Sequence, residues 1–297
     1  MSSPNSKAFL AVLLLETITG LSSSIFIIIC LYDPATKCQR FSTLNRILMA
    51  LSASNMSFLF TMSTHFLLLA VWPKFYNMLY VFYPICYLTL YSITSTCWLT
   101  SALSIFYFLK IIPSQSGILT KLKNMLDTMT GGLLLVPEVV SFSGSFLSLL
   151  ISNPNSFQTN ATKTETEDLM VRKVSFNGIV MALNFLPFII AIVTTVISAS
   201  LLKHYDGQMK KKIGHLNAKV KDYRTAVHTM SALLMFYTSM FLILIFFLLK
   251  ATDTTTWGYW ICVMLLFSHP TVQSAILIHG NPNLKEELRK LFTIITQ

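Results

Sequence analysis

The sequence predicts an all-α integral membrane protein, a bundle of seven transmembrane helices, and three observations support this prediction. The chain is 54% hydrophobic and only 11% charged over 297 residues, whereas a soluble globular chain has about 25% charged residues. Its apolar residues fall into seven long runs, and a membrane-spanning helix needs about 20 such residues. Lysine and arginine gather in alternate connections between these runs, as they do in oriented membrane proteins.

Each apolar run is expected to form one helix of a single membrane domain. The expected spans are residues 8–31, 47–71, 79–109, 128–151, 179–202, 226–249 and 257–280. The first contains one charge, Glu16, and the second ends at Trp72-Pro73, an interfacial aromatic followed by a helix breaker. The third has no charge before Lys110, and we expect it to be the most central helix. Prolines in the fourth, fifth and seventh runs are ordinary kink positions.

The connections between the spans set the expected orientation. Residues 152–178 form a long polar loop, 203–225 a strongly basic loop, and 281–297 a tail with an amphipathic helix after Pro282. With the N-terminus outside, the inner segments hold 16 lysines and arginines and the outer segments 6. Because positive residues stay inside, we expect a multi-pass plasma membrane protein with an extracellular N-terminus and a cytoplasmic C-terminus.

A glycosylation sequence agrees with this orientation. Asn160-Ala161-Thr162 lies in the polar loop that the orientation places outside, so Asn160 is an expected glycosylation site. Asn55-Met56-Ser57 has the same pattern but lies within the second span, where the glycosylation machinery cannot reach it.

Composition and motifs argue against several other classes of protein. The net charge is +10, but the basic residues sit in short loops between apolar runs, so we expect no nucleic acid partner. The five cysteines lie mostly in or beside spans without a C-x-x-C pair, so we expect no zinc, disulfide framework or other cofactor. The first run is long enough to span and stay, so we expect no cleaved signal peptide. An enzyme is the least favoured class, because no His-Glu-x-x-His, paired aspartates or nucleophile motif occurs in a span.

The stretch Trp98 to Lys110, WLTSALSIFYFLK, resembles the third-helix signature of the vertebrate type 2 (bitter) taste receptors. Further matches follow in order along most of the chain: Glu16-x-x-x-Gly20 with Phe26-Ile27; Ser42, Ile47-Leu48, Leu51 and Ser54; Leu186-Pro187-Phe188, Ser200-Leu201 and His204; and Pro270, Ser274, Ile276-Leu277-Ile278, Gly280-Asn281 and Leu284-Lys285. The resemblance implies a G protein-coupled receptor that binds small bitter molecules from outside. It also implies coupling to a heterotrimeric G protein of the gustducin or inhibitory type.

The sequence departs from that family's pattern at several positions, which identifies it as a divergent member. The changes are Ser24 for Asn, Asn45 for Asp, Asn55 for Arg, Gln273 for His, Ile93 for a ligand-site Asn, and Tyr223, Ala226 and His228 in place of His-x-x-Ala-x-Lys. Because of these changes, the family pattern does not fix the activation network or the ligand range of this chain. The changes do not affect the predicted fold. The chain also lacks Asp-Arg-Tyr after the third helix and a cysteine in 152–178, as that family does.

A receptor of this kind needs a cavity near the outer halves of the third, fifth, sixth and seventh helices. The candidates on the third helix recur at steps of three and four residues, so they share a face. The ligand-binding candidates are Cys86, Thr89, Leu90, Ile93, Thr94, Met181, Asn184, Phe185, Met240, Phe241, Leu244, Tyr259, Trp260, Val263 and Met264. Such a wall suits small, mostly apolar ligands, and methionine allows adaptable packing. The alternative for each residue is plain helix packing or lipid contact.

Two acids and two histidines lie inside or near spans. We expect Glu16, which shares a helix face with Gly20, to make a structural contact to the seventh helix. Glu138 is either a counter-ion for a cationic ligand or a protonated acid bonded to nearby serine or threonine. His65 and His269 are expected to be interfacial side chains near the outer ends of their spans.

The cytoplasmic face would carry the output of the receptor. The residues expected to face the G protein are Tyr107, Lys110, Lys121, Lys123, His204, Lys210, Lys211 and Lys212. The same basic residues also suit an anchor for anionic membrane lipid, so the coupling prediction depends on the family resemblance.

Two other functions remain open from the sequence. One is a chemosensory receptor of the vomeronasal type 1 group, which reads pheromone-like molecules. The other is a small-molecule transporter or channel, which would be expected to show paired intramembrane charges, broken helices or an inverted repeat. Glu16 and Glu138 are too few charges for that alternative.

Overall fold

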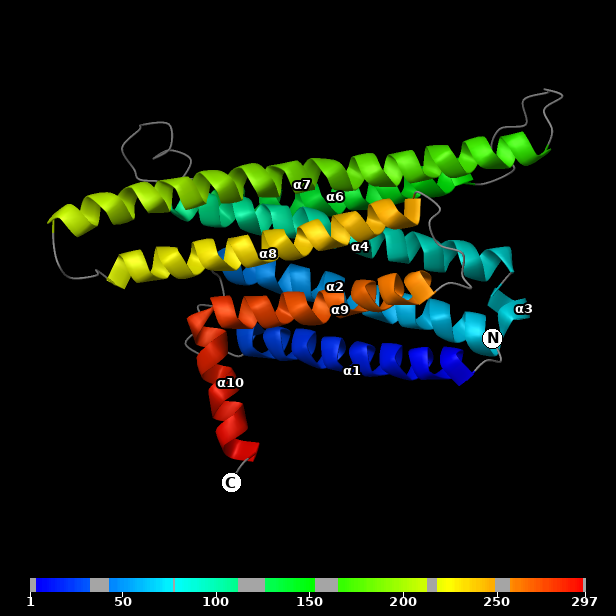
Figure 1. Ribbon diagram of the computed structural model, residues 1–297, viewed down its shortest axis with the longest axis horizontal. Helices are drawn as coiled ribbons and strands as arrows, with labels where there is room; N and C mark the ends of the chain where they lie inside the picture. Colours follow the sequence, from blue (N-terminus) through cyan, green and yellow to red (C-terminus); the bar gives the residue numbers. More distant parts are fainter. Residues whose placement is uncertain are drawn as a thin grey trace.

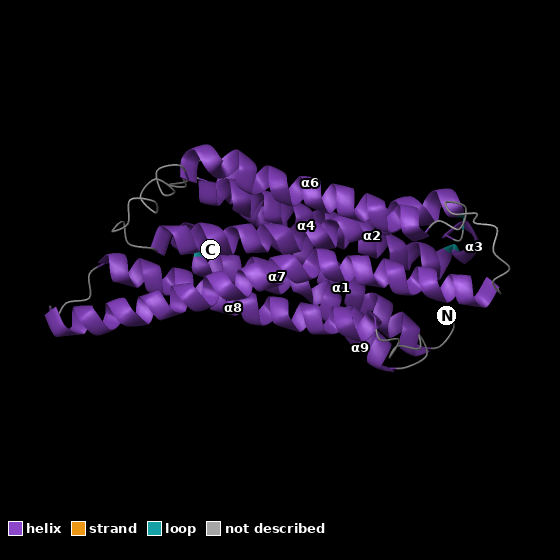
Figure 2. Ribbon diagram, turned by 90° about the horizontal axis from the view of Figure 1, so that it is seen from above, coloured by secondary structure: helices purple, strands orange, loops and turns teal. Residues whose placement is uncertain are grey.

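The computed structural model describes residues 4–32, 43–76, 78–111, 126–152, 165–212, 218–248 and 257–295. The helices are α1 (Pro4–Tyr32), α2 (Thr43–Val71), α3 (Pro73–Tyr76), α4 (Leu79–Ile111), α6 (Leu126–Ser152), α7 (Glu165–Lys212), α8 (Ala218–Leu248), α9 (Trp257–Gly280) and α10 (Pro282–Ile295). Seven helices of this described part are long and apolar enough to cross a membrane, namely α1, α2, α4, α6, α7, α8 and α9. They run side by side along the long axis of the molecule (Figures 1 and 2), which confirms the predicted seven-helix bundle.

Helix α4 is the central helix of the bundle, as predicted. It packs against α2, α6, α7 and α8. Of its most apolar 18-residue window, 78% is buried, against 28–50% for the other spanning helices. The remaining neighbours close the bundle around it, because α1 packs against α2 and α9, and α8 packs against α7 and α9. Most residues of this window of α4 are therefore enclosed by the neighbouring helices.

Two helices continue into segments that the sequence suggested were loops. Helix α7 begins at Glu165 and ends at Lys212, beyond both ends of the expected span 179–202, and α8 begins at Ala218 rather than near 226. For α7 the sequence supplies an electrostatic reason, since this helix opens with acidic residues and closes with Lys210, Lys211 and Lys212. Acids at an N-terminus and bases at a C-terminus stabilise a helix through its dipole, so hydropathy alone does not mark where such a helix stops.

The buried apolar side chains form two clusters. The proximal cluster, near the start of α10, comprises Ile27, Cys30, Leu31, Ile47, Leu48, Leu51, Leu99, Leu103, Phe106, Tyr107, Leu109, Val227, Met230, Leu233, Leu277, Ile278 and Leu284. The distal cluster, at the other end, comprises Leu13, Phe58, Leu59, Met62, Phe66, Cys97, Ala191, Tyr237, Met240, Val263, Leu266 and Phe267. On α2 and α9, buried polar residues such as Asn55 and Gln273 lie between the two clusters.

Helix α10 is the amphipathic tail helix that the sequence predicted after Pro282. It leaves the end of α9 at a steep angle to the bundle (Figure 1). Its first turn is capped by Asn281, whose Oδ1 accepts a hydrogen bond from the Asn283 backbone N–H at 3.1 Å. Leu284 is buried in the proximal cluster, whereas Leu291 and Phe292 are exposed. On the polar side, Lys290 donates to Glu287, and this hydrogen bond raises the pKa of Lys290.

Candidate functional site

Six of the fifteen ligand-binding candidates come together at the distal cluster. Met240 and Val263 are buried members of it, and Ile93, Tyr259, Trp260 and Met264 are half-buried side chains packed against it. These residues come from α4, α8 and α9, three of the four helices that were expected to line a cavity. The distal cluster is therefore where the largest group of these candidates comes together.

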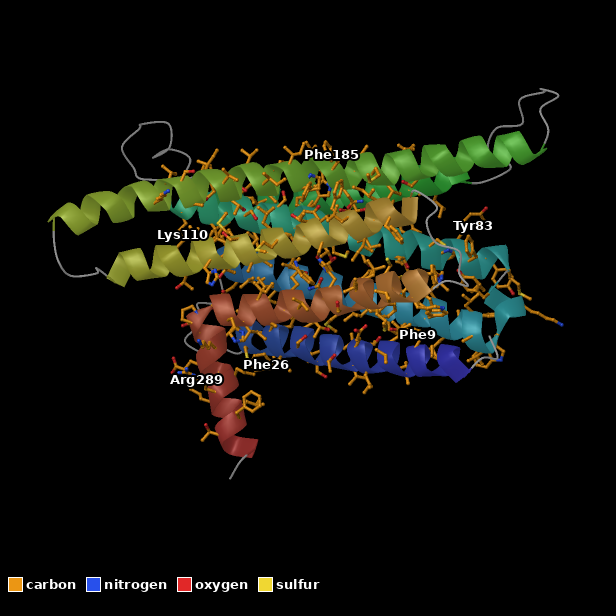
Figure 3. All side chains as sticks on the ribbon, in the orientation of Figure 1. Phe9, Phe26, Tyr83, Lys110, Phe185 and Arg289 are labelled. Carbon is orange, nitrogen blue, oxygen red and sulfur yellow. The ribbon has the colours of Figure 1, made fainter. Side chains whose placement is uncertain are left out.

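Aromatic rings form one wall of this site. Trp260 stacks on Phe9 with 5.2 Å between ring centroids, and Tyr259 meets it edge-on at 5.5 Å. Phe66 lies 6.4 Å from Trp260 and 5.6 Å from Phe267. Phe9 lies where α1 faces α9 (Figure 3). The indole of Trp260 thus joins α1, α2 and α9, in geometries that aromatic pairs favour.

The candidates on α7 and on the distal part of α8 divide between the interior and the surface of the bundle. Phe241 is buried and stacks on Phe188, with 4.7 Å between centroids. Phe185 is 48% exposed and lies on α7 at the edge of the bundle (Figure 3). Met181 and Leu244 are half-buried. Phe185 therefore faces away from the distal cluster, although its ring still touches Phe241 at 5.9 Å.

Two of the predicted polar residues keep unused hydrogen-bonding capacity. Asn184 is buried, and its Nδ2 donates to the Val180 carbonyl at 2.7 Å, but its Oδ1 has no partner among the described residues. Thr89 Oγ1 is also enclosed without a partner in that part of the chain. An enclosed polar atom without a partner is costly, so each could accept a hydrogen bond from a polar group on a ligand. The other α4 candidates, Cys86, Leu90 and Thr94, are half-buried or buried.

The sequence did not single out several residues that build this site. Tyr237 is buried in the distal cluster, and its hydroxyl donates to the Asn184 carbonyl at 3.2 Å. Trp98 Nε1 donates to the Leu183 carbonyl at 3.2 Å, which ties α4 to α7. Phe9 and Phe66 also belong to spans, but no spacing rule separates them from other apolar residues there. Tyr237 and Trp98 could have been singled out only by their polar atoms, because a buried Tyr hydroxyl or Trp N–H usually finds a hydrogen-bond partner.

Glu138 is held by side chains of α4. Its carboxylate accepts hydrogen bonds from the Tyr91 hydroxyl and from Ser95 Oγ, the latter at 3.0 Å. The Tyr91 ring is enclosed by Tyr87 and Phe142, each with its centroid 6.5 Å away. Both carboxylate oxygens are engaged, so this geometry agrees with the hydrogen-bonded alternative for Glu138 rather than with a free counter-ion.

We expect Glu138→Leu to destabilise the protein, whereas Glu138→Gln retains most of its stability. The leucine variant leaves the Tyr91 and Ser95 hydroxyls unpaired in the bundle, at a cost of about 1–3 kcal/mol each. Glutamine keeps an acceptor oxygen for one of them. Thermal unfolding of the detergent-purified protein measures the difference. Equal melting temperatures for the two variants would show that the hydrogen bonds are unimportant, and loss of response to amine ligands alone in Glu138→Gln would favour the counter-ion.

A buried polar chain crosses the middle of the bundle. Asn55 Oδ1 accepts from Thr96 Oγ1 at 3.5 Å, and Gln273 Nε2 donates to Thr100 Oγ1 at 2.8 Å. Thr96 and Thr100 are one turn apart on α4, so they connect α2 with α9. Asn55 Nδ2 and Gln273 Oε1 keep no partner in the described part of the chain. Two departures from the resembled family's pattern, at positions 55 and 273, thus lie in one network.

Glu16 was expected to contact the seventh helix, α9. In the structure Gly20, one turn further along α1, lies at this contact. A Cβ at Gly20 would lie 2.6 Å from Leu59 Cδ1 and 2.8 Å from Thr271 Oγ1, so the α1 backbone packs directly on α2 and α9. Glu16 Oε2 is enclosed without a partner among the described residues.

The interpretation of His269 as an interfacial residue was wrong. Its side chain is buried in the middle of α9 and stacks on Phe236, with 4.9 Å between ring centroids. Rotation of α9 turns this position towards α8, which the apolar pattern of the span does not reveal. His65 lies near the distal end, where its Nδ1 is 3.0 Å from the Tyr76 hydroxyl. Tyr76 is buried, and burial raises the pKa of its hydroxyl.

The residues expected to face a G protein lie at the opposite end of the bundle. Lys110 is exposed there (Figure 3), but Tyr107 is only 6% exposed and packs within the proximal cluster. His204, Lys210, Lys211 and Lys212 are on the last turns of α7. Lys121, Lys123 and the sequon residue Asn160 lie outside the described residues.

Along almost its entire length, the chain is similar to one family of known proteins. The model of the taste receptor protein family (TAS2R) matches residues 1–296. Taste receptor type 2 member 39 of Papio hamadryas is 26% identical over 292 residues, which are 95% of this chain and 85% of the relative. The human protein of that name is 24% identical over 289 residues, with the same two coverages. Taste receptor type 2 member 143 of Rattus norvegicus is 24% identical over 207 residues, covering 67% of this chain and 70% of the relative.

Proposed function

We propose that this chain, which belongs to the taste receptor type 2 family, binds small, mostly apolar bitter molecules at the distal cluster. Family membership and the seven-helix bundle make it a bitter taste receptor of the G protein-coupled class. The family is a receptor family rather than an enzyme class, and neither the vomeronasal type 1 nor the transporter alternative is favoured. What we propose beyond this is the place of the ligand, the kind of G protein and the orientation in the membrane.

One observation carries the ligand-site proposal: Ile93, Trp260 and Met240, from three different helices, all pack in the distal cluster. Aromatic and apolar walls bind apolar molecules, and a few polar atoms orient them. Asn184 Oδ1 and Thr89 Oγ1 supply such atoms, since each is enclosed without a partner among the described residues. Methionines such as Met240 and Met264 can adapt to ligands of different shape.

The proposed orientation places the distal cluster towards the outside of the plasma membrane. The distribution of lysine and arginine supports an extracellular N-terminus. In that orientation Asn160 lies in an extracellular loop, where it can be glycosylated. The opposite end of the bundle, with Lys110 and the C-terminal turns of α7, then faces the cytoplasm and a G protein of the gustducin or inhibitory type.

A calcium-release assay tests the receptor function directly. Cells that carry the full chain and a promiscuous G protein are exposed to a panel of bitter compounds, with surface display measured by an extracellular N-terminal tag. We expect at least one compound to release calcium in these cells and not in cells that lack the G protein. Normal surface display without a response to any compound would contradict the proposal, and an inaccessible N-terminal tag would contradict the orientation.

A further inference from the structure

A groove of about 900 Å³ lies between α8 and α9, close to the start of α10. It shares no residue with the fifteen ligand-binding candidates. Its lining is Thr225, Val227, His228, Thr229, Ser231 and Ala232 on α8, and Thr271, Val272, Ala275, Ile276, His279 and Gly280 on α9. The volume falls in the range of about 300–1,000 Å³ that is usual for small-molecule sites, so the groove is large enough for a bound molecule.

The groove opens towards lipid rather than into the bundle. His228, Ala275 and His279 on its rim are exposed, whereas Val227 and Thr229 at its base are buried. All twelve lining residues belong to the apolar spans Thr225–Phe246 and Gly258–Gly280. In a bilayer, an occupant must therefore come from the lipid phase, and an apolar surface must cover most of it.

The shape of the groove favours a rigid, flat occupant. Small residues, Ala232 and Ala275, face the groove from its two walls. Gly280 packs against Thr229, where a Cβ at position 280 would lie 2.6 Å from Thr229 Cγ2. This close approach holds α8 and α9 together at the α10 end. A flexible acyl chain loses conformational entropy when it is ordered in such a groove, whereas a rigid ring system loses little.

One polar group at the α10 end can bind a hydroxyl. His279 Nδ1 lies 3.0 Å from the Ala275 carbonyl oxygen. A carbonyl oxygen only accepts, so Nδ1 is the donor in this bond. In the tautomer that carries its proton on Nδ1, Nε2 is an acceptor. His279 occupies the last turn of α9, where the apolar span ends. A hydroxyl attached to an apolar body would meet this acceptor at the depth of the membrane interface.

We propose that this groove binds a sterol of the surrounding membrane. The fused rings of the sterol lie against Ala232 and Ala275, and its hydroxyl donates to His279 Nε2. This binding site lies outside the ligand site and needs neither a bitter molecule nor a G protein.

Photolabelling of the full chain in cell membranes tests the site. The probe is a sterol that carries a diazirine on its rings and an alkyne on its tail, and labelled peptides are identified by mass spectrometry. We expect labelling at residues 225–232 and 271–280, and competition by excess unmodified sterol. A sterol methyl ether, which cannot donate a hydrogen bond, should compete less well.

Three variants, each of which replaces an alanine by phenylalanine, give the decisive comparison. In Ala275→Phe a ring fills the groove, and labelling should fall by about five-fold or more. Ala232→Phe fills it from the opposite wall and replaces Ala275→Phe if that variant does not reach the membrane. Ala53→Phe changes an exposed alanine on α2, outside the groove, and should label as the parent does.

Labelling that is unchanged in both groove variants, or equally strong on every lipid-facing helix, would overturn the sterol site. If excess phospholipid reduced the labelling as much as excess sterol does, the groove would be assigned to acyl chains instead. A receptor that gives no calcium response but is labelled in the groove would leave the sterol site standing and contradict only the proposed function.

Discussion

Trp260→Ala is expected to lower the potency of an active bitter ligand by about ten-fold or more, which corresponds to about 1.4 kcal/mol of binding free energy. The Trp260 indole touches Phe9, Phe66 and Tyr259 and so forms a wall to which α1, α2 and α9 contribute. Its removal takes away a large aromatic surface and the stacking geometry that goes with it. Dose–response curves for calcium release measure the effect.

Trp72→Ala is the matched control for this prediction. Trp72 lies at the same end of the bundle, but its side chain is 62% exposed, so the same truncation should leave potency unchanged. Ile93→Ala approaches the distal cluster from α4 and should also alter potency, with normal surface display. If both Trp260→Ala and Ile93→Ala respond like the parent to every active ligand, the ligand site is elsewhere.

The number of helices and the central helix could be predicted because lipid imposes strong rules. A span must satisfy all its backbone hydrogen bonds internally, which makes each long apolar run a helix. The freedom from charge over residues 79–109 correctly indicated that α4 is enclosed by other helices. The ends of α7 could not be placed in this way, since Lys203 to Lys212 form helix without any apolar signal.

The rotation of each helix about its axis limited the prediction of the site. Periodicity shows that Thr89 and Ile93 share a face of α4, but it does not say which neighbour that face meets. Phe185 and Trp260 were chosen on the same grounds, yet Phe185 is turned towards the surface and Trp260 joins the distal cluster. His269 looked interfacial and is buried against α8, because contacts between α8 and α9 decide its direction.

Contacts between distant parts of the chain were beyond the sequence argument. Glu138 had two open interpretations, and only the packing of α6 on α4 brings Tyr91 and Ser95 to its carboxylate. Tyr237 and Phe66 entered the site for the same reason. Apolar residues are frequent in every span, so composition does not distinguish the few that point inward from those that meet lipid.

Gly280→Val is expected to destabilise the bundle by about 1–3 kcal/mol, the usual cost of overpacking. A Cβ at position 280 would lie 2.6 Å from Thr229 Cγ2 and 3.0 Å from Thr229 Cβ. Thr229 cannot turn aside easily, since its Oγ1 donates to the Thr225 carbonyl at 2.9 Å and a β-branched side chain has few rotamers in a helix. The helices must separate instead. Thermal unfolding of purified protein should show a melting temperature lower by about 2–4 °C for each kcal/mol.

Gly258→Val, on the same helix, separates this packing effect from the general cost of changing a glycine. A Cβ at Gly258 meets no atom within 4 Å, so valine fits there without displacing a neighbour. Valine is also the better helix former of the two residues. We therefore expect Gly258→Val not to lower the melting temperature. If both variants melt together, α8 and α9 do not approach each other closely at Gly280. If only Gly280→Val melts early, the absence of a side chain at position 280 is what allows these two helices to meet beside α10.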